Sequence, residues 1–253
     1  SNWYRRIALY PSGEMKWVFN VAGILLQYAP VIGPDGTIYL NGLGFGGPYM
    51  LYAIEPEDGS LKWSFTAKGM IGSVAIAEDG TIYYSCDEGL GALNSDGSIK
   101  WICPDADGWD SSPVIGDDGT IYTLGDDLAA VKDNGSSATI EWRISGPTYY
   151  AHRSVAVGYE GMVYAQGADA RYDVRDNGSS AEIIWKFYAL RDQWTDAFTS
   201  PSVDAEGTVY TFQEGLVYAL FPDGAIKWVC DTGEYNSSGL AIGNTGCVYI
   251  TGS

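Results

Sequence analysis

Two tryptophans, Trp109 and Trp194, lie in polar segments that stand outside the regular patterns of the chain. An exposed aromatic ring offers a sugar a flat apolar face, and neighbouring carboxylates and amides bind its hydroxyl groups. The predicted ligand-binding residues are Trp109, Asp110, Tyr149, Tyr150, His152, Arg153, Trp194, Asp196, Tyr235 and Asn236. The alternative is that the aromatic rings pack against their own loops.

His152 is the only histidine of the chain, and Arg153 follows it directly. A histidine that lies near Asp110 could act as a general acid and base. No motif marks a serine or cysteine nucleophile beside it. His152 is therefore a weak catalytic candidate, and the alternative is a polar residue at the rim of the fold.

The segment PDADGWD, residues 104–110, carries three carboxylates around a glycine. Calcium prefers such oxygen-rich clusters, so Asp105, Asp107 and Asp110 are weak candidates for a metal site. The segment lacks the full EF-hand pattern and a distal bidentate glutamate, and the alternative is a solvated acidic turn. No other cofactor is expected.

The composition excludes some classes of partner. The 253-residue chain carries a formal net charge of −18, which repels phosphate backbones and anionic lipids, so nucleic acid is not expected as a partner. No stretch approaches the roughly 18 apolar residues of a membrane helix, so direct membrane insertion is not expected either. The sequence shows no signal peptide and opens inside a repeat without Met, which favours a processed or trimmed chain.

Four cysteines, Cys86, Cys103, Cys230 and Cys247, lie in predicted strands or at strand ends. They form no CxxC motif and have no metal-ligand spacing. We expect buried free thiols. A disulfide is the alternative, and its partners cannot be deduced from the sequence.

Six further tryptophans recur at intervals of 38 to 46 residues: Trp17, Trp63, Trp101, Trp142, Trp185 and Trp228. Four of them end the phrase Gly-x-x-Lys-Trp, and a second phrase, typified by DGTIY at residues 35–39, recurs between them. A period in this range is typical of a repeat architecture. Asp-Gly between two β-rich runs indicates a tight hairpin, because glycine supplies the positive φ that the turn needs. Each repeat therefore predicts four short antiparallel strands.

Four-stranded units of this length form the blades of β-propellers. We predict an all-β, six-bladed propeller in a single domain, residues 1–253, with the recurrent tryptophans filling the wedges between neighbouring sheets. The predicted blades span residues 29–66, 72–103, 111–144, 153–187, 199–230, and 238–251 with 6–19.

The two ends of the chain carry complementary parts of one repeat. Residues 8–13 match the third strand at residues 219–224, and the chain stops in a second strand at residues 248–250. We expect the sixth blade to join two C-terminal strands with two N-terminal strands, which removes the open sheet edges and closes the ring. Complementary halves favour a closed propeller over a fragment of a larger ring.

The phrases "SSPVIGDDGTIYTLGDDLAAV", "LYAIEPEDGSLKW" and "VYALFPDGAIKW" carry the repeat most clearly. In these phrases, and over essentially its whole length, the chain resembles the PQQ-like β-propeller repeat family. The resemblance implies a propeller fold and an exported bacterial or archaeal protein, often a surface protein. The quinoprotein alcohol dehydrogenases of this family have eight blades, a bound calcium, a catalytic aspartate and a disulfide between adjacent cysteines. This chain has about six repeats and no adjacent cysteines, so PQQ is not expected and no catalytic residue is carried over.

Strand alternation separates the loops onto two faces. The turns between first and second strands and between third and fourth strands are short, whereas the other two sets of loops vary from repeat to repeat. Variable loops on a rigid scaffold commonly carry function. We therefore expect a non-enzymatic binding or scaffold propeller that holds a glycan or protein ligand on this variable-loop face. It would be extracellular, cell-surface or periplasmic, and part of a longer multidomain chain. The alternative is a six-bladed hydrolase, lactonase or lyase, with or without calcium, whose site lies at the mouth of the central channel.

Overall fold

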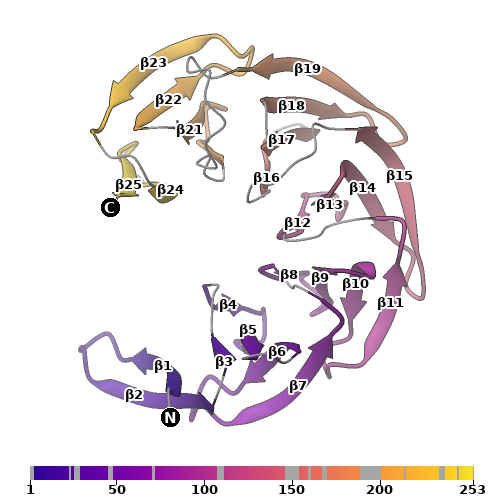
Figure 1. Cartoon of the computed structure of the whole chain (residues 1–253), viewed down its shortest axis with the longest axis vertical. Helices are drawn as coiled ribbons and strands as arrows, with labels where there is room; N and C mark the ends of the chain where they lie inside the picture. The colour runs from indigo at the N-terminus through magenta and orange to yellow at the C-terminus, as the bar shows by residue number, and fades with distance from the viewer. Residues whose placement is uncertain are drawn as a thin grey trace. The chain divides into compact units, whose positions relative to one another are not determined.

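Within the described residues, the elements of the computed structural model are β-strands, and they run along the chain through short sheets (Figure 1). The structure describes residues 3–22, 24–25, 29–44, 48–69, 72–106, 111–145, 154–158, 161–166, 170–188, 201–213, 215–233, 237–243 and 245–252. Within these residues no helix is long and apolar enough to cross a membrane. The all-β class and the antiparallel four-stranded units predicted from the sequence are confirmed.

The chain divides into two units, and the first comprises residues 1–115 and 133–139. Its first sheet pairs β1 (Trp3–Leu9) with β2 (Met15–Ala22). Its second sheet contains β3 (Ile24–Leu25), β4 (Val31–Ile32), β5 (Ile38–Gly44), β6 (Tyr49–Ile54) and β7 (Leu61–Ala67). Its third sheet contains β8 (Ala75–Ile76), β9 (Ile82–Cys86), β10 (Gly89–Leu93) and β11 (Ile99–Cys103). The strand β3 is additional to the four predicted for its repeat, and it pairs with the end of β5.

The second unit comprises residues 116–132 and 140–253. One of its sheets contains β16 (Ser154–Val157), β17 (Met162–Gln166), β18 (Arg171–Asp176) and β19 (Ala181–Phe187). The next contains β20 (Ser202–Val203), β21 (Val209–Gln213), β22 (Leu216–Leu220) and β23 (Ile226–Asp231), and a last one pairs β24 (Ser237–Ile242) with β25 (Val248–Gly252). A further four-stranded sheet contains residues of both units and has the order β12 (Val114–Ile115), β13 (Ile121–Leu124), β14 (Asp127–Asp133) and β15 (Ala138–Ser145).

The two chain ends form the half-blades that the sequence predicts. Each end folds into a two-stranded antiparallel sheet, β1 with β2 and β24 with β25. Ala8 lies opposite Trp17, as Ala219 lies opposite Trp228 in a complete sheet, so β1 and β2 occupy third and fourth strand positions. The joining of residues 6–19 with residues 238–251 in one blade stays a prediction.

One cross-strand register recurs in the sheets. Tyr39 lies opposite Ala53, and Ala53 lies opposite Trp63. Because directly opposed residues share a face of a sheet, the small alanine lets the two rings meet above it, with their centroids 5.8 Å apart. The Trp63 ring then covers Gly97 of the neighbouring sheet, where any β-carbon would meet the ring at 2.7 Å. The tryptophan is thus held between two sheets, as predicted.

The tight turns follow from the Asp-Gly phrase. Gly36 adopts a φ of +84°, which residues with a β-carbon rarely reach. The Asp35 carboxylate accepts hydrogen bonds from the Thr37 backbone N–H at 2.9 Å and from the Thr37 hydroxyl at 2.7 Å. These hydrogen bonds are the main cause that lowers the pKa of Asp35. The phrase therefore encodes both the turn and its anchor.

The four cysteines are free thiols. Cys86 and Cys103 are buried as expected, whereas Cys230 and Cys247 are exposed, which corrects the prediction that all four are buried. Cys230 lies in β23, and every residue of that strand is exposed.

Candidate functional site

Almost all of the sequence-predicted site residues lie outside the described part of the chain. These residues are Asp107, Trp109, Asp110, Tyr149, Tyr150, His152, Arg153, Trp194, Asp196, Tyr235 and Asn236. Asp105 is described, and it is an exposed residue of the turn after β11. Among the described residues no group of three or more His, Cys, Asp or Glu side chains could hold a metal ion. The predicted ligand and calcium sites therefore stay predictions.

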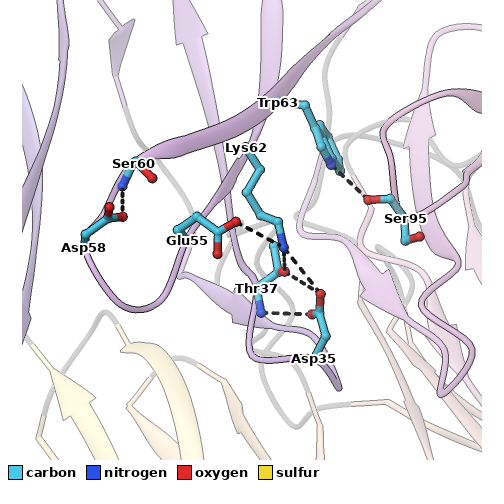
Figure 2. A network of polar contacts seen from close by, with 8 residues as sticks. All are labelled: Asp35, Thr37, Glu55, Asp58, Ser60, Lys62, Trp63 and Ser95. Carbon is cyan, nitrogen blue, oxygen red and sulfur yellow. Dashed lines mark hydrogen bonds and ion pairs between the residues drawn. The ribbon is translucent and has the colours of Figure 1, made fainter.

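The recurrent charged residues of the repeat hold the hairpins together. Figure 2 shows Lys62 reaching from β7 to the turn before β5, where its Nζ donates to the Thr37 hydroxyl at 2.9 Å. The same ammonium group lies 3.6 Å from carboxylate oxygens of Asp35 and of Glu55. Lys100 and Lys227 repeat the contact with threonines of their own sheets, at 3.0 Å and 3.1 Å. The lysine of the Lys-Trp phrase is therefore structural.

The tryptophan of that phrase has a similar structural role. The Trp63 Nε1–H donates to the Ser95 carbonyl oxygen of the next sheet at 2.9 Å (Figure 2). Trp185 donates in the same way to the Pro222 carbonyl oxygen at 3.0 Å. The phrases that make the repeat recognisable are thus used by the scaffold, and a functional site has to lie where the repeats differ.

Two buried charges mark such a difference in the second unit. Arg171 and Asp173 both have 0% of their surface exposed, and among the described residues no other charged side chain is buried. Both belong to β18, and side chains two residues apart share one face of a strand. Asp173 lies between Tyr164 and Trp185 in the register, and Arg171 lies opposite Phe187.

The other sheets of four or five strands carry apolar residues at these two positions, whereas the N-terminal pair of strands carries Arg6 two residues before Ala8. The alanine between the tyrosine and the tryptophan is Ala53, Ala92 or Ala219, each with 0% exposure. Asp173 occupies that position in its own sheet. Two residues earlier stand Leu51, Leu90 or Val217, and Arg171 takes their place. The phrase RYDV thus replaces LYAI, LGAL or VYAL, and a comparison of the repeats could have found it from the sequence.

The facing sheet is polar at the same level. The Phe187 ring meets the Tyr218 ring edge-on, with centroids 5.1 Å apart, so this face of the β16–β19 sheet packs against the β20–β23 sheet. Thr211 lies opposite Tyr218 in the register and therefore shares its face, as does Gln213 two residues further on. In the first unit the corresponding residues, Tyr84 and Cys86, pack with Leu51 in an apolar core. We call Arg171, Asp173, Thr211 and Gln213 the polar interface cluster.

Most of the polar side-chain atoms in the polar interface cluster have no hydrogen-bond partner. Nε, Nη1 and Nη2 of Arg171, both carboxylate oxygens of Asp173, Oγ1 of Thr211 and Oε1 of Gln213 are buried without a hydrogen-bond partner. Burial lowers the pKa of Arg171 to about 9. Burial also raises the pKa of Asp173 to about 7, although the charges of Arg171 and Arg175 and the nearby Trp185 indole N–H oppose this rise. Both shifts favour neutral forms, because a buried charge without partners is costly.

The polar interface cluster lies at one end of its sheets. β17 ends at Gln166 and β18 begins at Arg171, while β21 ends at Gln213. The chain segments that follow these ends connect second to third strands, and such connections belong to the predicted variable-loop face. The cluster therefore lies at the end of the blades where the sequence predicts binding.

The sequence profile of the family described as PQQ_2, outer membrane protein assembly factor BamB, matches residues 7–141. No curated protein sequence matches the chain.

Several solved structures share the fold. BamB from Moraxella catarrhalis has a TM-score of 0.71 at 16% identity, with 98% of this chain and 79% of that chain covered. Quinohemoprotein alcohol dehydrogenase from Comamonas testosteroni has a TM-score of 0.71 at 12% identity, with 97% of this chain and 59% of that chain covered. A protein of unknown function from Bacteroides caccae has a TM-score of 0.51 at 11% identity, with 87% of this chain and 86% of that chain covered. These likenesses confirm the β-propeller fold, and the matching family profile confirms the predicted PQQ-like repeat.

Proposed function

Because the chain belongs to the outer membrane protein assembly factor BamB family, we propose that it is a non-enzymatic propeller that binds protein partners as a scaffold. The observation that carries this proposal is the family match over residues 7–141. We place the protein outside the cytoplasm, in the periplasm or at the cell surface. A folded repeat scaffold whose recurrent polar residues anchor its own hairpins is suited to presenting loops.

We assign the partner to the variable-loop face. The predicted residues Trp109 and Trp194 belong to connections between fourth and first strands on that face. Tryptophans contribute much of the binding energy at protein interfaces, because a large rigid ring buries area at low entropic cost. The glycan alternative uses the same rings for stacking on sugars.

A photo-crosslinking experiment in native cells tests this proposal. A benzoyl-phenylalanine group replaces Trp109 or Trp194, and a matched control places it at Asp96, an exposed residue in the short turn between β10 and β11. We expect a discrete protein adduct at Trp109 and Trp194 and none at Asp96. Equal adducts at all three positions, or none at the two tryptophans, would contradict the proposal.

Two further outcomes would favour one of the alternative functions predicted from the sequence over the scaffold function. Binding on a glycan array that Trp109→Ala or Trp194→Ala abolishes would assign the face to a carbohydrate. Turnover of an ester, lactone or glycoside that His152→Ala abolishes would assign the protein to the enzyme class.

A further inference from the structure

The polar interface cluster has an excess of unmatched hydrogen-bonding groups. Arg171 supplies buried N–H donors, Thr211 supplies a hydroxyl group, and Asp173 supplies a carboxyl group. Nearly all buried polar groups in folded proteins have a partner, so a set of unpartnered ones on two facing sheets indicates an occupant. A single orphaned atom would be weaker evidence than this group of facing residues.

The two charged members do not satisfy each other. Arg171 and Asp173 lie two residues apart on one strand face, yet no hydrogen bond joins the guanidinium to the carboxylate. An occupant that joins them has to accept hydrogen bonds from Arg171. A planar carboxylate fits this requirement best, because its two oxygens match two parallel N–H groups of a guanidinium.

We propose that Arg171, Asp173, Thr211 and Gln213 form a binding site for a small carboxylate between the β16–β19 and β20–β23 sheets. Arg171 binds the two oxygens of the ligand through its guanidinium, and the Thr211 hydroxyl donates a third hydrogen bond. The Gln213 side chain donates an amide N–H to the ligand when its amide group is flipped, which exchanges its oxygen and nitrogen. Phe187 and Tyr218, whose rings meet at the same interface, exclude water from the apolar part of the ligand.

Asp173 completes the site in its acid form. Its raised pKa keeps a proton available near neutral pH, so the carboxyl group donates to the bound carboxylate. The groups next to Asp173 are Tyr164 from β17, Trp185 from β19, and Arg171 and Arg175 from its own strand, and Tyr218 of the opposite sheet packs with Tyr164. A protonated Asp173 leaves the buried Arg171 charge uncompensated, and the ligand carboxylate supplies the missing negative charge.

This site goes beyond the scaffold function and does not depend on it. The ligand is a free small carboxylate held inside the propeller, whereas the scaffold function concerns protein partners on the surface loops. A crosslinking experiment that fails at Trp109 and Trp194 would leave the carboxylate site untouched, and the reverse also holds.

Sodium acetate is the probe for this site, with sodium chloride at equal ionic strength as the control. In a ¹⁵N-labelled protein, we expect acetate to shift the Arg171 Nε–H signal and to raise the unfolding midpoint as its concentration increases. Loss of the guanidinium hydrogen bonds in Arg171→Leu should weaken acetate binding about tenfold or more. Asp173→Asn keeps an N–H donor in place of the acid, so we expect this variant to bind acetate.

A second variant distinguishes a loss of acetate binding from misfolding. Arg171→Leu/Asp173→Ala carries the residues that other repeats have at these positions, so it should fold and show no response to acetate. The proposal is overturned if acetate leaves the Arg171 signal in place, if chloride shifts it equally, or if the double variant responds like the wild type. Loss of binding in Asp173→Asn would also overturn it, since the carboxylate would then act as an acceptor.

Discussion

Two interfaces between neighbouring sheets share one framework and differ in what fills it. In the first unit the β3–β7 sheet packs against the β8–β11 sheet, and Leu51 and Ala53 face Tyr84 in a continuous apolar core. In the second unit the β16–β19 sheet packs against the β20–β23 sheet, and Arg171 and Asp173 take the corresponding positions. Both interfaces keep the tryptophan over a glycine and its hydrogen bond to a carbonyl group of the next sheet.

The comparison teaches which positions of the repeat are free to change. The tryptophans and the Asp-Gly turns hold the sheets together, so the residues nearer the variable loops are free to change from apolar to polar. The exchange keeps the register but removes the ring contact across it, because Asp173 stands where an alanine lets two rings meet. Among the described ring pairs, Tyr39 and Trp63 meet at 5.8 Å, whereas Tyr164 and Trp185 do not form such a pair.

The largest expected effect comes from moving the charge into the apolar interface. Leu51→Arg places a guanidinium beside Tyr84 and Cys86. Ala53 stands here where the second unit has Asp173, so no carboxylate at that position compensates the new charge. We expect a loss of about 3–5 kcal/mol in the free energy of unfolding, because an uncompensated charge is buried. Urea denaturation measures this loss, and Leu51→Met, which conserves volume, should cost less than about 1.5 kcal/mol. A loss below about 1 kcal/mol for Leu51→Arg would show that the two interfaces do not differ in polarity.

The shared framework predicts equal costs in the two interfaces. Trp63→Ala and Trp185→Ala each remove a ring that is held between sheets and a hydrogen bond to a carbonyl group. We expect each to lower the free energy of unfolding by about 3–5 kcal/mol, as for other large aromatic truncations. A neutral Trp185→Ala beside a destabilising Trp63→Ala would contradict the comparison, since the two interfaces would then also differ in the role of their tryptophans.

A smaller effect concerns pH. The pKa of Asp173 is raised from 3.8 to about 7, so the folded state holds the proton more tightly than the unfolded state. Its contribution to stability is fully present below about pH 4 and is lost as pH rises to about 7. The stability of the wild type relative to Asp173→Asn should therefore fall across this window, and denaturation at a series of pH values measures the difference. The first unit has no buried carboxylate among its described residues, so Ala53→Ser should leave the pH profile unchanged. A wild-type to Asn difference that stays constant or rises with pH would contradict the raised pKa.

Much of the fold could be predicted from the sequence, because its determinants are local. The DGTIY phrase specifies a hairpin within five residues, and β9 and β13 begin at its isoleucine, Ile82 and Ile121. The additional strand β3 was not predicted, since its pairing with Gly44 and Leu43 depends on an extension of β5 that carries no repeat signal.

The polar interface cluster was not predicted for a different reason. Its environment arises between two packed sheets, with Arg171 on β18 and Thr211 forty residues later on β21. A charged pair within one strand gives no signal as long as the repeats are taken to be equivalent and only their loops are compared. The signal was present in RYDV, whose alternation predicts a strand with two charges on one face.

The unfolding free energy of Arg171→Leu/Asp173→Ala tests most directly the claim that these charges are kept for binding and not for stability. The variant gives the second interface the residues of the first, and it is compared with the wild type at pH 7 in a buffer without carboxylates. Replacing buried charges by packed apolar residues is often neutral or stabilising, so we predict a gain of about 1–4 kcal/mol. A loss of about 1 kcal/mol or more would contradict the account, because Arg171 and Asp173 would then support the fold itself.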